Sequence, residues 1–343
     1  MKVLESADNK NIGAVLHKHD KKILSLLCEN IRYPISRIAN LVKLSRQSVE
    51  YRIKVMQQHS LLVGSRSVIN IQQLGFYSHH FFLNVHHPQS EAEFIERAKN
   101  NEFVNVLINY SGMYNFEVSI IARSAAVALH RFLDIIEGLQ VVSYTPCIVL
   151  STLTSKVLPD SFTEEVTSLK SFKNDSSFHK IFSAKRVEHT CDTTDKKIMK
   201  VLADDAQCTL TAIGKEVGLT NDGVNYRIKK LIQSGYIKGF RPAVNYSVLG
   251  LNIQSVLIKF STRDRSTDRR FRQFLRENQV VLWATELFGG WDYLLYVIDK
   301  DQIQIHTFMQ ELKNEFSDNI QSYEILFAYR EYKYSFMTKE VTQ

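Results

Sequence analysis

The chain has 343 residues, 44% of them apolar, a formal net charge of +7 and an isoelectric point near 9.0. This length and apolar content exclude a fibrous or a disordered protein and suffice for two to four globular domains. The basic excess favours anionic partners.

An internal repeat organises the chain. Residues 20–75 recur at 195–250 without a gap, with 19 identities over 56 positions, where unrelated sequences would share roughly three or four. The period is far longer than a solenoid unit, so each copy should be a self-sufficient set of domains. The predicted domains are a tail (1–19), a head (20–75), a companion domain (76–158), a linker (159–194), a second head (195–250) and a second companion domain (251–337).

Each head begins with apolar residues at helical spacing behind an aspartate, Asp20 in the first copy and Asp195 in the second. This pattern predicts an N-cap and a first helix. A second short helix and a tight turn follow. Ser45 and Thr220 then occupy the N-cap position of a third helix.

The third helix has an apolar face and a polar face. Val49 and Ile53 lie on the apolar face, while Tyr51 and Lys54 project away from it at about 100° per residue. After this helix, residues 62–66 and 237–241 predict a turn into a short strand pair, or wing, in each head. Each head is therefore predicted to be a winged helix-turn-helix.

The polar face suits the major groove of DNA, with polar side chains on base edges and cations on phosphates. A solvated face used for packing or protein contact is the competing interpretation, but segments 20–71 and 195–246 carry net charges of +6 and +4, which together exceed that of the whole chain. The predicted DNA-contacting residues are Ser45, Arg46, Gln47, Ser48, Tyr51, Arg52, Lys54 and Arg66 in the first head, and Thr220, Asn221, Asp222, Asn225, Tyr226, Arg227, Lys229 and Arg241 in the second.

The two heads differ near the start of the third helix. The second head places Asp222 and Gly223 where the first has Gln47 and Ser48. An aspartate accepts a hydrogen bond from cytosine but repels phosphate, so we expect the second head to bind more weakly or to read different bases.

Each companion domain has the order βαββαβ, the ferredoxin-like plan, so the fold class is α+β. The predicted elements are 81–85, 91–100, 103–110, 114–121, 125–137 and 141–153 in the first copy, and 255–260, 269–277, 280–288, 293–298, 302–316 and 320–329 in the second. Helices on one side leave an apolar sheet face open, and such faces pair with a like face. We expect an internal pseudo-dimer, with further homo-oligomers as an open alternative.

A glycine turn joins the second and third strands of each companion domain, Gly112-Met113-Tyr114-Asn115 and Gly289-Gly290-Trp291-Asp292. Glycine exposes backbone amides, and an adjacent Asn or Asp can anchor a small amino or carboxyl compound. Taken alone, the same residues favour an ordinary hairpin turn.

Several classes of site are not indicated. The four cysteines lack paired spacing, which predicts reduced thiols and neither zinc nor disulfides. His130 and His306 have no second ligand at metal spacing, and no catalytic constellation stands out, so we expect neither an enzyme nor a metal nor a cofactor. Without an apolar run of membrane-spanning length or an N-terminal apolar core, a soluble cytoplasmic protein is expected.

Motifs in both copies resemble the Lrp/AsnC family of feast/famine regulators over nearly the whole chain, apart from the tail and the linker. They are Val49-x-x-Arg52-Ile53, Gly64, Asn70 and Leu74-Gly75 in the first copy, and Val224-x-x-Arg227-Ile228, Gly235 to Gly239, Asn245 and Leu249-Gly250 in the second, with the turn Gly-x-aromatic-Asn/Asp in each. The resemblance implies a DNA-binding transcriptional regulator whose ferredoxin-like domain dimerises and binds an amino acid or related metabolite near the turn.

On this resemblance the effector-binding candidates are Gly112, Tyr114, Asn115, Gly289, Trp291 and Asp292. The first copy departs from the family pattern at Asn115, where Asp is usual, and at Ser60, where the second copy has Gly235. A tandem chain supplies both heads covalently, which predicts a reader of an imperfect palindrome in double-stranded DNA.

Two other functions remain open. Siroheme decarboxylases share the AsnC-like fold, sometimes as fused pairs, and use histidine and arginine around a tetrapyrrole. No His-Tyr-containing stretch of their kind is evident around the sheet, and the turn 289–292 suits the regulators better. The other alternative is a metabolite-sensing scaffold without DNA binding.

Overall fold

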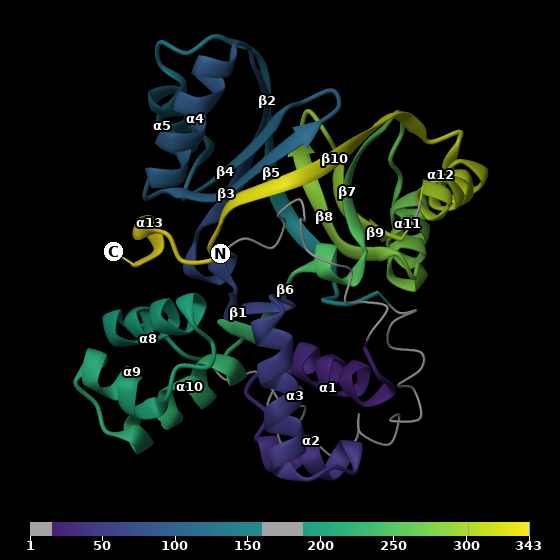
Figure 1. The fold of residues 1–343 in the computed structure, drawn as a ribbon. Coiled ribbons are helices and arrows are strands. Elements are labelled where there is room, and N and C mark those ends of the chain that lie inside the picture. Colours follow the sequence, from purple (N-terminus) through teal and green to yellow (C-terminus); the bar gives the residue numbers. More distant parts are fainter. Residues whose placement is uncertain (1–15, 160–187, 301, 343) are drawn as a thin grey trace. The chain divides into compact units, whose positions relative to one another are not determined.

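The computed structural model describes residues 16–159, 188–300 and 302–342 (Figure 1). They form two compact units, which we call the head unit and the sheet unit. The head unit contains the described residues 16–76, 188–244 and 335–342, and the sheet unit contains 77–159 and 245–334. No helix in these described ranges is both long and apolar enough to cross a membrane.

Both predicted three-helix heads are present in the head unit. The helices are α1 (Lys18–Glu29), α2 (Ile35–Val42) and α3 (Arg46–Gln58) in the first copy, and α8 (Thr193–Asp204), α9 (Leu210–Val217) and α10 (Asn221–Gln233) in the second. A short C-terminal helix that the sequence did not predict, α13 (Lys339–Thr342), contacts α8.

The first helix of each head starts earlier than predicted. Asp20 and Asp195 are not N-caps but third-position residues, because their carboxylates accept hydrogen bonds from the backbone N–H of His17 (3.0 Å) and Asp192 (3.3 Å). A carboxylate at this position satisfies a helix-end donor and favours the positive end of the helix dipole. Helix α8 thus takes in residues 193–194 of the predicted linker. Residues 160–187 of that linker, and residues 1–15, lie outside the described residues.

The prediction of a strand pair within each head is wrong. Each copy supplies one long strand, β1 (Leu62–Ile69) or β6 (Ile237–Val244), and the two pair with each other in an antiparallel two-stranded sheet. Strand β1 runs on into a 3-10 helix (η1, Ile71–Leu74), so its own head contains no return strand to pair with. The backbone donors of β1 are satisfied by the other copy instead.

The heads are interlocked around this sheet. Strand β1 of the first copy packs on α8 of the second, where the Ser67 hydroxyl donates to the carbonyl oxygen of Leu202 at 2.9 Å. In the opposite direction, the backbone N–H of Ile31 donates to the carbonyl oxygen of Phe240 on β6 at 3.1 Å. Each head therefore completes the core of the other.

The sheet unit confirms the predicted ferredoxin-like plan in both copies. The first copy contains β2 (Tyr77–Val85), α4 (Pro88–Asn100), β3 (Val104–Ser111), β4 (Phe116–Ala122), α5 (Ala125–Ile136) and β5 (Val141–Ser155). The second contains β7 (Asn252–Phe260), α11 (Arg265–Glu277), β8 (Val281–Gly289), β9 (Tyr293–Asp299), α12 (Gln302–Phe316) and β10 (Ile320–Tyr334), preceded by a 3-10 helix, η3 (Tyr246–Leu249).

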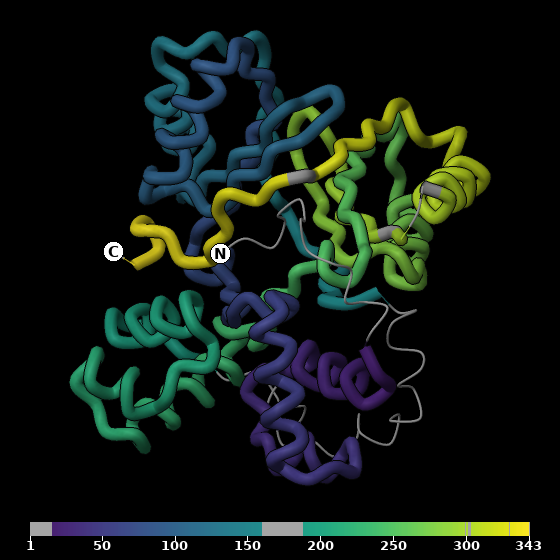
Figure 2. Tube along the Cα trace, viewed as in Figure 1, coloured from purple at the N-terminus to yellow at the C-terminus, as the bar shows by residue number. Residues whose placement is uncertain are grey.

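The eight strands close on themselves in the order β10-β3-β4-β2-β5-β8-β9-β7. The copies meet at two antiparallel junctions, β5 with β8 and β3 with β10; Figure 2 shows the last strand, in yellow, beside the blue β3. Helices α4 and α5 cover the outer side of one sheet, and α11 and α12 that of the other (Figure 1). The inner faces share a third core, built from both copies.

A buried polar network crosses this inner core. The Glu117 carboxylate is 0% exposed and contacts His80 Nδ1 at 2.6 Å. It also accepts hydrogen bonds from the hydroxyls of Tyr110 (2.6 Å) and, from the other copy, Tyr296 (3.3 Å). Burial, reinforced by the neighbouring carboxylate, raises the pKa of both tyrosines, so both hydroxyls stay protonated as donors.

Only the first copy has the acceptor of this network, the Glu117 carboxylate. At a shift of 177 positions, Leu294 stands where the first copy has Glu117, and Leu287 where it has Tyr110. The second copy contributes donors instead: Tyr296, and Ser255, whose hydroxyl lies 2.9 Å from that of Tyr110. The two inner faces are therefore complementary rather than alike.

Replacing Glu117 with Leu should lower the free energy of unfolding by about 3 kcal/mol, because three buried polar groups lose their acceptor. Both tryptophans, Trp283 and Trp291, lie in the sheet unit, so urea unfolding followed by tryptophan fluorescence measures the effect. As a control, Glu96→Leu at an exposed ion pair should change the value by less than about 1 kcal/mol. Equal effects of the two substitutions would contradict a stabilising role for the network.

Candidate nucleic-acid interface and sheet turns

The third helix of each head starts at the predicted N-cap. The Ser45 hydroxyl accepts a hydrogen bond from the backbone N–H of Ser48 at 3.1 Å, and the Thr220 hydroxyl accepts one from Gly223 at 3.2 Å. These bonds satisfy donors that the first helical turn leaves unpaired. The start of each helix is therefore fixed by its own sequence.

The inner and outer faces of α3 and α10 separate as predicted. Val49 and Val224 are fully buried, whereas Tyr51 is 70% and Tyr226 64% exposed. The other exposed candidates are Ser45, Arg46, Gln47 and Lys54 on the first head and Thr220, Asn221, Asp222 and Lys229 on the second, while Ser48 and Asn225 are half-buried. Each head thus presents a polar surface that includes an exposed tyrosine ring.

Arg46 is held only by an exposed contact, since its Nε donates to Glu50 on the next turn at 2.9 Å. Exposed ion pairs of this kind contribute at most about 1 kcal/mol to stability, because water and salt screen them. Arg46 is therefore available to exchange Glu50 for a base edge or a phosphate.

Arg52 and Arg227, predicted to contact phosphates, are half-buried and form ion pairs with aspartates at the first helix of their heads. Arg52 Nη1 lies 2.6 Å from Asp20 Oδ1, and Arg227 Nη1 lies 2.8 Å from both Asp192 Oδ2 and Asp195 Oδ1. Three residues after Val49 or Val224, a side chain projects beside the buried face, toward the first helix.

Electrostatics agree with this placement in the second head. Burial alone would raise the pKa of Asp192, but hydrogen bonds from the Asp195 backbone and from the Arg227 side chain lower it below its ordinary value. Its hydrogen bonds to the Asp192 and Asp195 carboxylates raise the pKa of Arg227. The pair is therefore ionised throughout the range in which DNA binding is measured.

Arg66 and Arg241, predicted to lie on a wing formed within each head, lie instead in the ladder that the two heads share. They lie directly opposite each other in the β1–β6 ladder and are half-buried. They sit in mid-ladder because the strand pair is shared between the heads and no wing hairpin forms within either one.

The two predicted effector turns meet in the inner core of the sheet unit. Tyr114 and Trp291 are buried, and the Trp291 Nε1–H donates to the Tyr114 hydroxyl at 3.3 Å. That hydroxyl also lies 2.9 Å from Thr145 Oγ1 on β5. The aromatic residues of the turns therefore join the two copies.

Asn115 and Asp292 hold their turns in the same way. Asn115 Oδ1 accepts a hydrogen bond from the backbone N–H of Val85 at 3.0 Å, and Asp292 Oδ2 accepts one from Phe260 at 2.8 Å. Both side chains thus tie the turn to the end of the first strand. The departure from Asp to Asn in the first copy leaves this contact intact.

Gly112 and Gly289 are required by conformation and by close packing. Their φ angles are +144° and +136°, which side chains rarely adopt. A Cβ on Gly289 would lie 2.4 Å from the carbonyl oxygen of Pro146 in the other copy, and one on Gly112 would lie 2.9 Å from Leu326 Cδ2. Each turn is therefore a hairpin between paired antiparallel strands, as its sequence alone favours, and it also packs against the other copy.

Gly289→Ala should destabilise the sheet unit by about 3 kcal/mol, since it combines backbone strain with a backbone clash. Gly138→Ala is the matched control: its φ is also positive, at +75°, but its Cβ would meet nothing within 4 Å. The control should lose about 1 kcal/mol. Urea unfolding curves measure both, and equal losses would mean that close packing at the turn contributes nothing.

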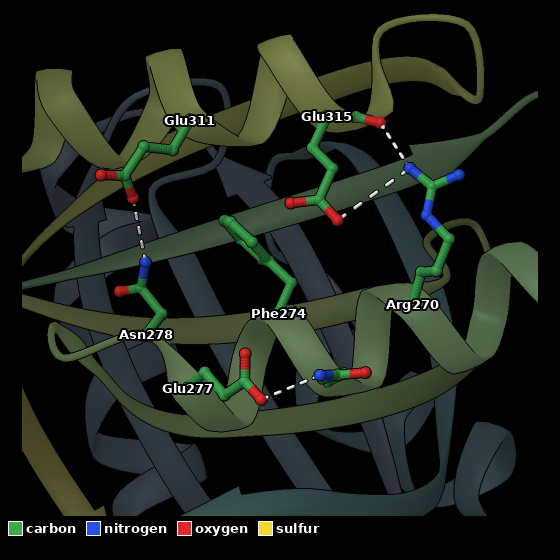
Figure 3. Close-up of a pocket in the computed structure, with 7 residues that line it drawn as sticks. Arg270, Phe274, Glu277, Asn278, Glu311 and Glu315 are labelled. Atoms are coloured by element: carbon green, nitrogen blue, oxygen red, sulfur yellow. Dashed lines mark hydrogen bonds and ion pairs between the residues drawn. The ribbon is translucent and has the colours of Figure 1, made fainter.

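A further concavity, which the sequence did not indicate, lies between α11 and α12 on the outer side of the sheet unit (Figure 3). It has a volume of about 370 Å³ and is lined by Arg270, Gln273, Phe274, Glu277, Asn278, Glu311 and Glu315. Its polar side chains pair with one another: Asn278 donates to Glu311 at 3.2 Å, and Arg270 to the carbonyl oxygen of Glu315 at 3.1 Å. Three carboxylates against one guanidinium make it unsuited to DNA.

Within residues 16–159, 188–300 and 302–342, no group of three or more His, Cys, Asp or Glu side chains is placed to hold a metal ion. The four cysteines are free thiols. Burial raises the pKa of the Cys147 thiol to about 11, so this group stays protonated at neutral pH.

Two family models match the heads. Residues 18–57 match the AsnC-type helix-turn-helix domain, and residues 192–238 match a winged helix-turn-helix DNA-binding domain. With two capped third helices on trihelical cores, the chain is a helix-turn-helix DNA-binding protein.

Curated relatives narrow the class. The chain is 30% identical to the transcriptional regulator AzlB of Bacillus subtilis over 119 residues, which are 34% of this chain and 76% of that protein. It is 33% identical to the proline dehydrogenase transcriptional activator of Rhizobium radiobacter over 112 residues, 32% of this chain and 71% of that protein. The chain belongs to the Lrp/AsnC family of DNA-binding transcriptional regulators.

A solved structure matches nearly the whole length of the chain. The crystal structure of the siroheme decarboxylase NirDL aligns with a TM-score of 0.61 over 95% of this chain and 96% of its own, at 13% sequence identity. Identity this low shows a shared fold alone. The predicted α+β architecture with two heads and two ferredoxin-like domains is confirmed.

Proposed function

We propose that the chain is a sequence-specific transcriptional regulator whose recognition helices α3 and α10 read two unlike half-sites in double-stranded DNA. One observation carries the proposal: both helices are capped at their N-termini, buried on one face and exposed on the other, within one compact unit. An exposed polar helix anchored in this way fits the major groove.

The exposed residues divide by chemistry. Arg46 and Gln47 at the start of α3, and Asn221 at the start of α10, suit hydrogen bonds to base edges. Lys54 and Lys229, two turns further along the same surfaces, suit phosphates. The cap residues Ser45 and Thr220 place exposed hydroxyls beside the helix N-terminus, where phosphate oxygens bind favourably.

The half-sites should differ because the heads do. Arg46 favours a bidentate contact with guanine, whereas Asp222 accepts from cytosine and repels phosphate. An operator with one strong and one weak half-site follows from this asymmetry.

We also propose that an amino acid or related metabolite contacts the sheet turns. The support is the exposure of residues 111–113 and 288–290, and the half-buried Lys259–Asp292 ion pair beside the second turn. The buried rings of Tyr114 and Trp291 and the strand-bound Asn115 and Asp292 would then respond to the effector through the backbone of the turn.

We propose that this chain regulates transcription and does not decarboxylate siroheme. The relatives with the higher identities are regulators, and His80 in the inner core is engaged by Glu117. If this is right, adding siroheme to the purified protein should leave the siroheme absorption spectrum unchanged at micromolar concentrations. A shifted spectrum, or loss of the substrate's carboxylates by mass spectrometry, would support the enzyme instead.

DNA binding is tested by selecting duplexes from a random library with the full chain and then titrating the selected duplex at several salt concentrations. Binding should weaken steeply with salt, and Lys54→Met with Lys229→Met should flatten the log–log slope by about 0.9 per lysine. Lys99→Met on the sheet unit is the control and should leave the slope unchanged. Absence of any binding at low salt would favour the metabolite-sensing scaffold.

A further inference from the structure

We propose that Arg52 and Arg227 are positioning residues, which set the rotation of each recognition helix through aspartates on the first helix and do not bind phosphate. The proposal rests on the DNA-binding function above and assigns to these arginines a role opposite to that expected from their charge.

In the first head the contact is short and sheltered. Arg52 Nη1 lies 2.6 Å from Asp20 Oδ1, and the two side chains are 28% and 12% exposed. The other carboxylate oxygen of Asp20 accepts the backbone N–H of His17 at 3.0 Å. Asp20 is thus held by its own helix, and Arg52 is held by Asp20.

The second head repeats the contact with more partners. Asp195 is fully buried and binds Arg227 through Oδ1 and the His189 ring through Oδ2, at 2.8 and 2.7 Å. Asp192 adds a second carboxylate to Arg227 at 2.8 Å. The carbonyl oxygen of His189 accepts the hydroxyl of Tyr236 at 3.2 Å, which ties the segment before α8 to the same cluster.

These ion pairs fix the rotation of the recognition helix about its axis, which apolar packing alone leaves adjustable. Apolar packing is non-directional, so a helix held by Val49 and Met56 alone retains some freedom to rotate about its axis. A charged hydrogen bond is directional, and Arg52 follows Tyr51 directly in the chain. Rotation at Arg52 therefore moves the exposed ring of Tyr51 across the surface that meets the bases.

The two roles predict different salt dependence. A lost phosphate contact lowers affinity for all sequences alike and flattens the salt slope by about 0.9. A lost positioning contact leaves the number of neutralised phosphates unchanged but misplaces the groups that read bases. It therefore lowers the ratio of specific to non-specific affinity.

The experiment compares Arg52→Met and Arg227→Met with Lys54→Met and Lys229→Met in the full chain. Affinities are measured at salt concentrations from about 50 to about 300 mM, so that the slope of log affinity against log salt can be determined. Each variant is tested on the library-selected duplex and on a scrambled duplex of the same composition. The arginine variants should keep the wild-type slope and lose about tenfold in the specific to non-specific ratio. The lysine variants should keep the wild-type ratio of specific to non-specific affinity and show a flatter salt slope.

Arg52→Lys should restore most of the ratio, because an ammonium can keep a single contact with Asp20. If an arginine variant fails to fold, Asp20→Asn and Asp195→Asn test the same contact with the arginines intact, and these too should lower the ratio. A slope flattened by about one unit at constant ratio in the arginine variants would overturn the proposal. Failure of the wild-type chain to bind any duplex would instead overturn the proposed function itself.

Discussion

The structure depends on the need of each strand for a backbone partner. A strand edge left open in water exposes unpaired donors and acceptors and invites aggregation. Here the partner comes from the other copy at three places: β1 pairs with β6, β5 with β8, and β3 with β10. A second copy is therefore a structural requirement within each unit, and each copy alone would lack partners for three of its strand edges.

The contacts that serve this pairing also occupy the residues most suggestive of chemistry. The glycine turns carry the sequence signature of a ligand site, yet their glycines admit the neighbouring strand and their aromatic rings bond to each other. The arginines of α3 and α10 carry the charge of a phosphate contact, yet they bind aspartates of the first helices. In both cases the suggestive residues hold the structure in place, and neighbouring residues form the exposed surface.

Local sequence predicted the helices of both repeats, the N-caps of α3 and α10 and the order of strands, because periodicity and capping are local properties. It placed the starts of α1 and α8 too late, at Asp20 and Asp195. It did not predict the partner of β1, because a ladder depends on a strand about 175 residues away. The position of Arg52 beside the buried face could have been predicted, because at 3.6 residues per turn it lies only about 60° from Val49 around the helix. In β4 the alternation of Glu117 and Ser119 with Phe116 and Val118 is typical of a solvent-facing strand, and only the second sheet reveals that this polar face is buried.

The one-sided network around Glu117 makes the copies non-interchangeable. A face bearing the carboxylate needs an opposing face that brings hydroxyls, and two carboxylate-bearing faces would bury charge against charge. The first repeat produced by itself would thus be poorly suited to pairing with its own twin. The network therefore favours pairing between unlike repeats over pairing between two first repeats.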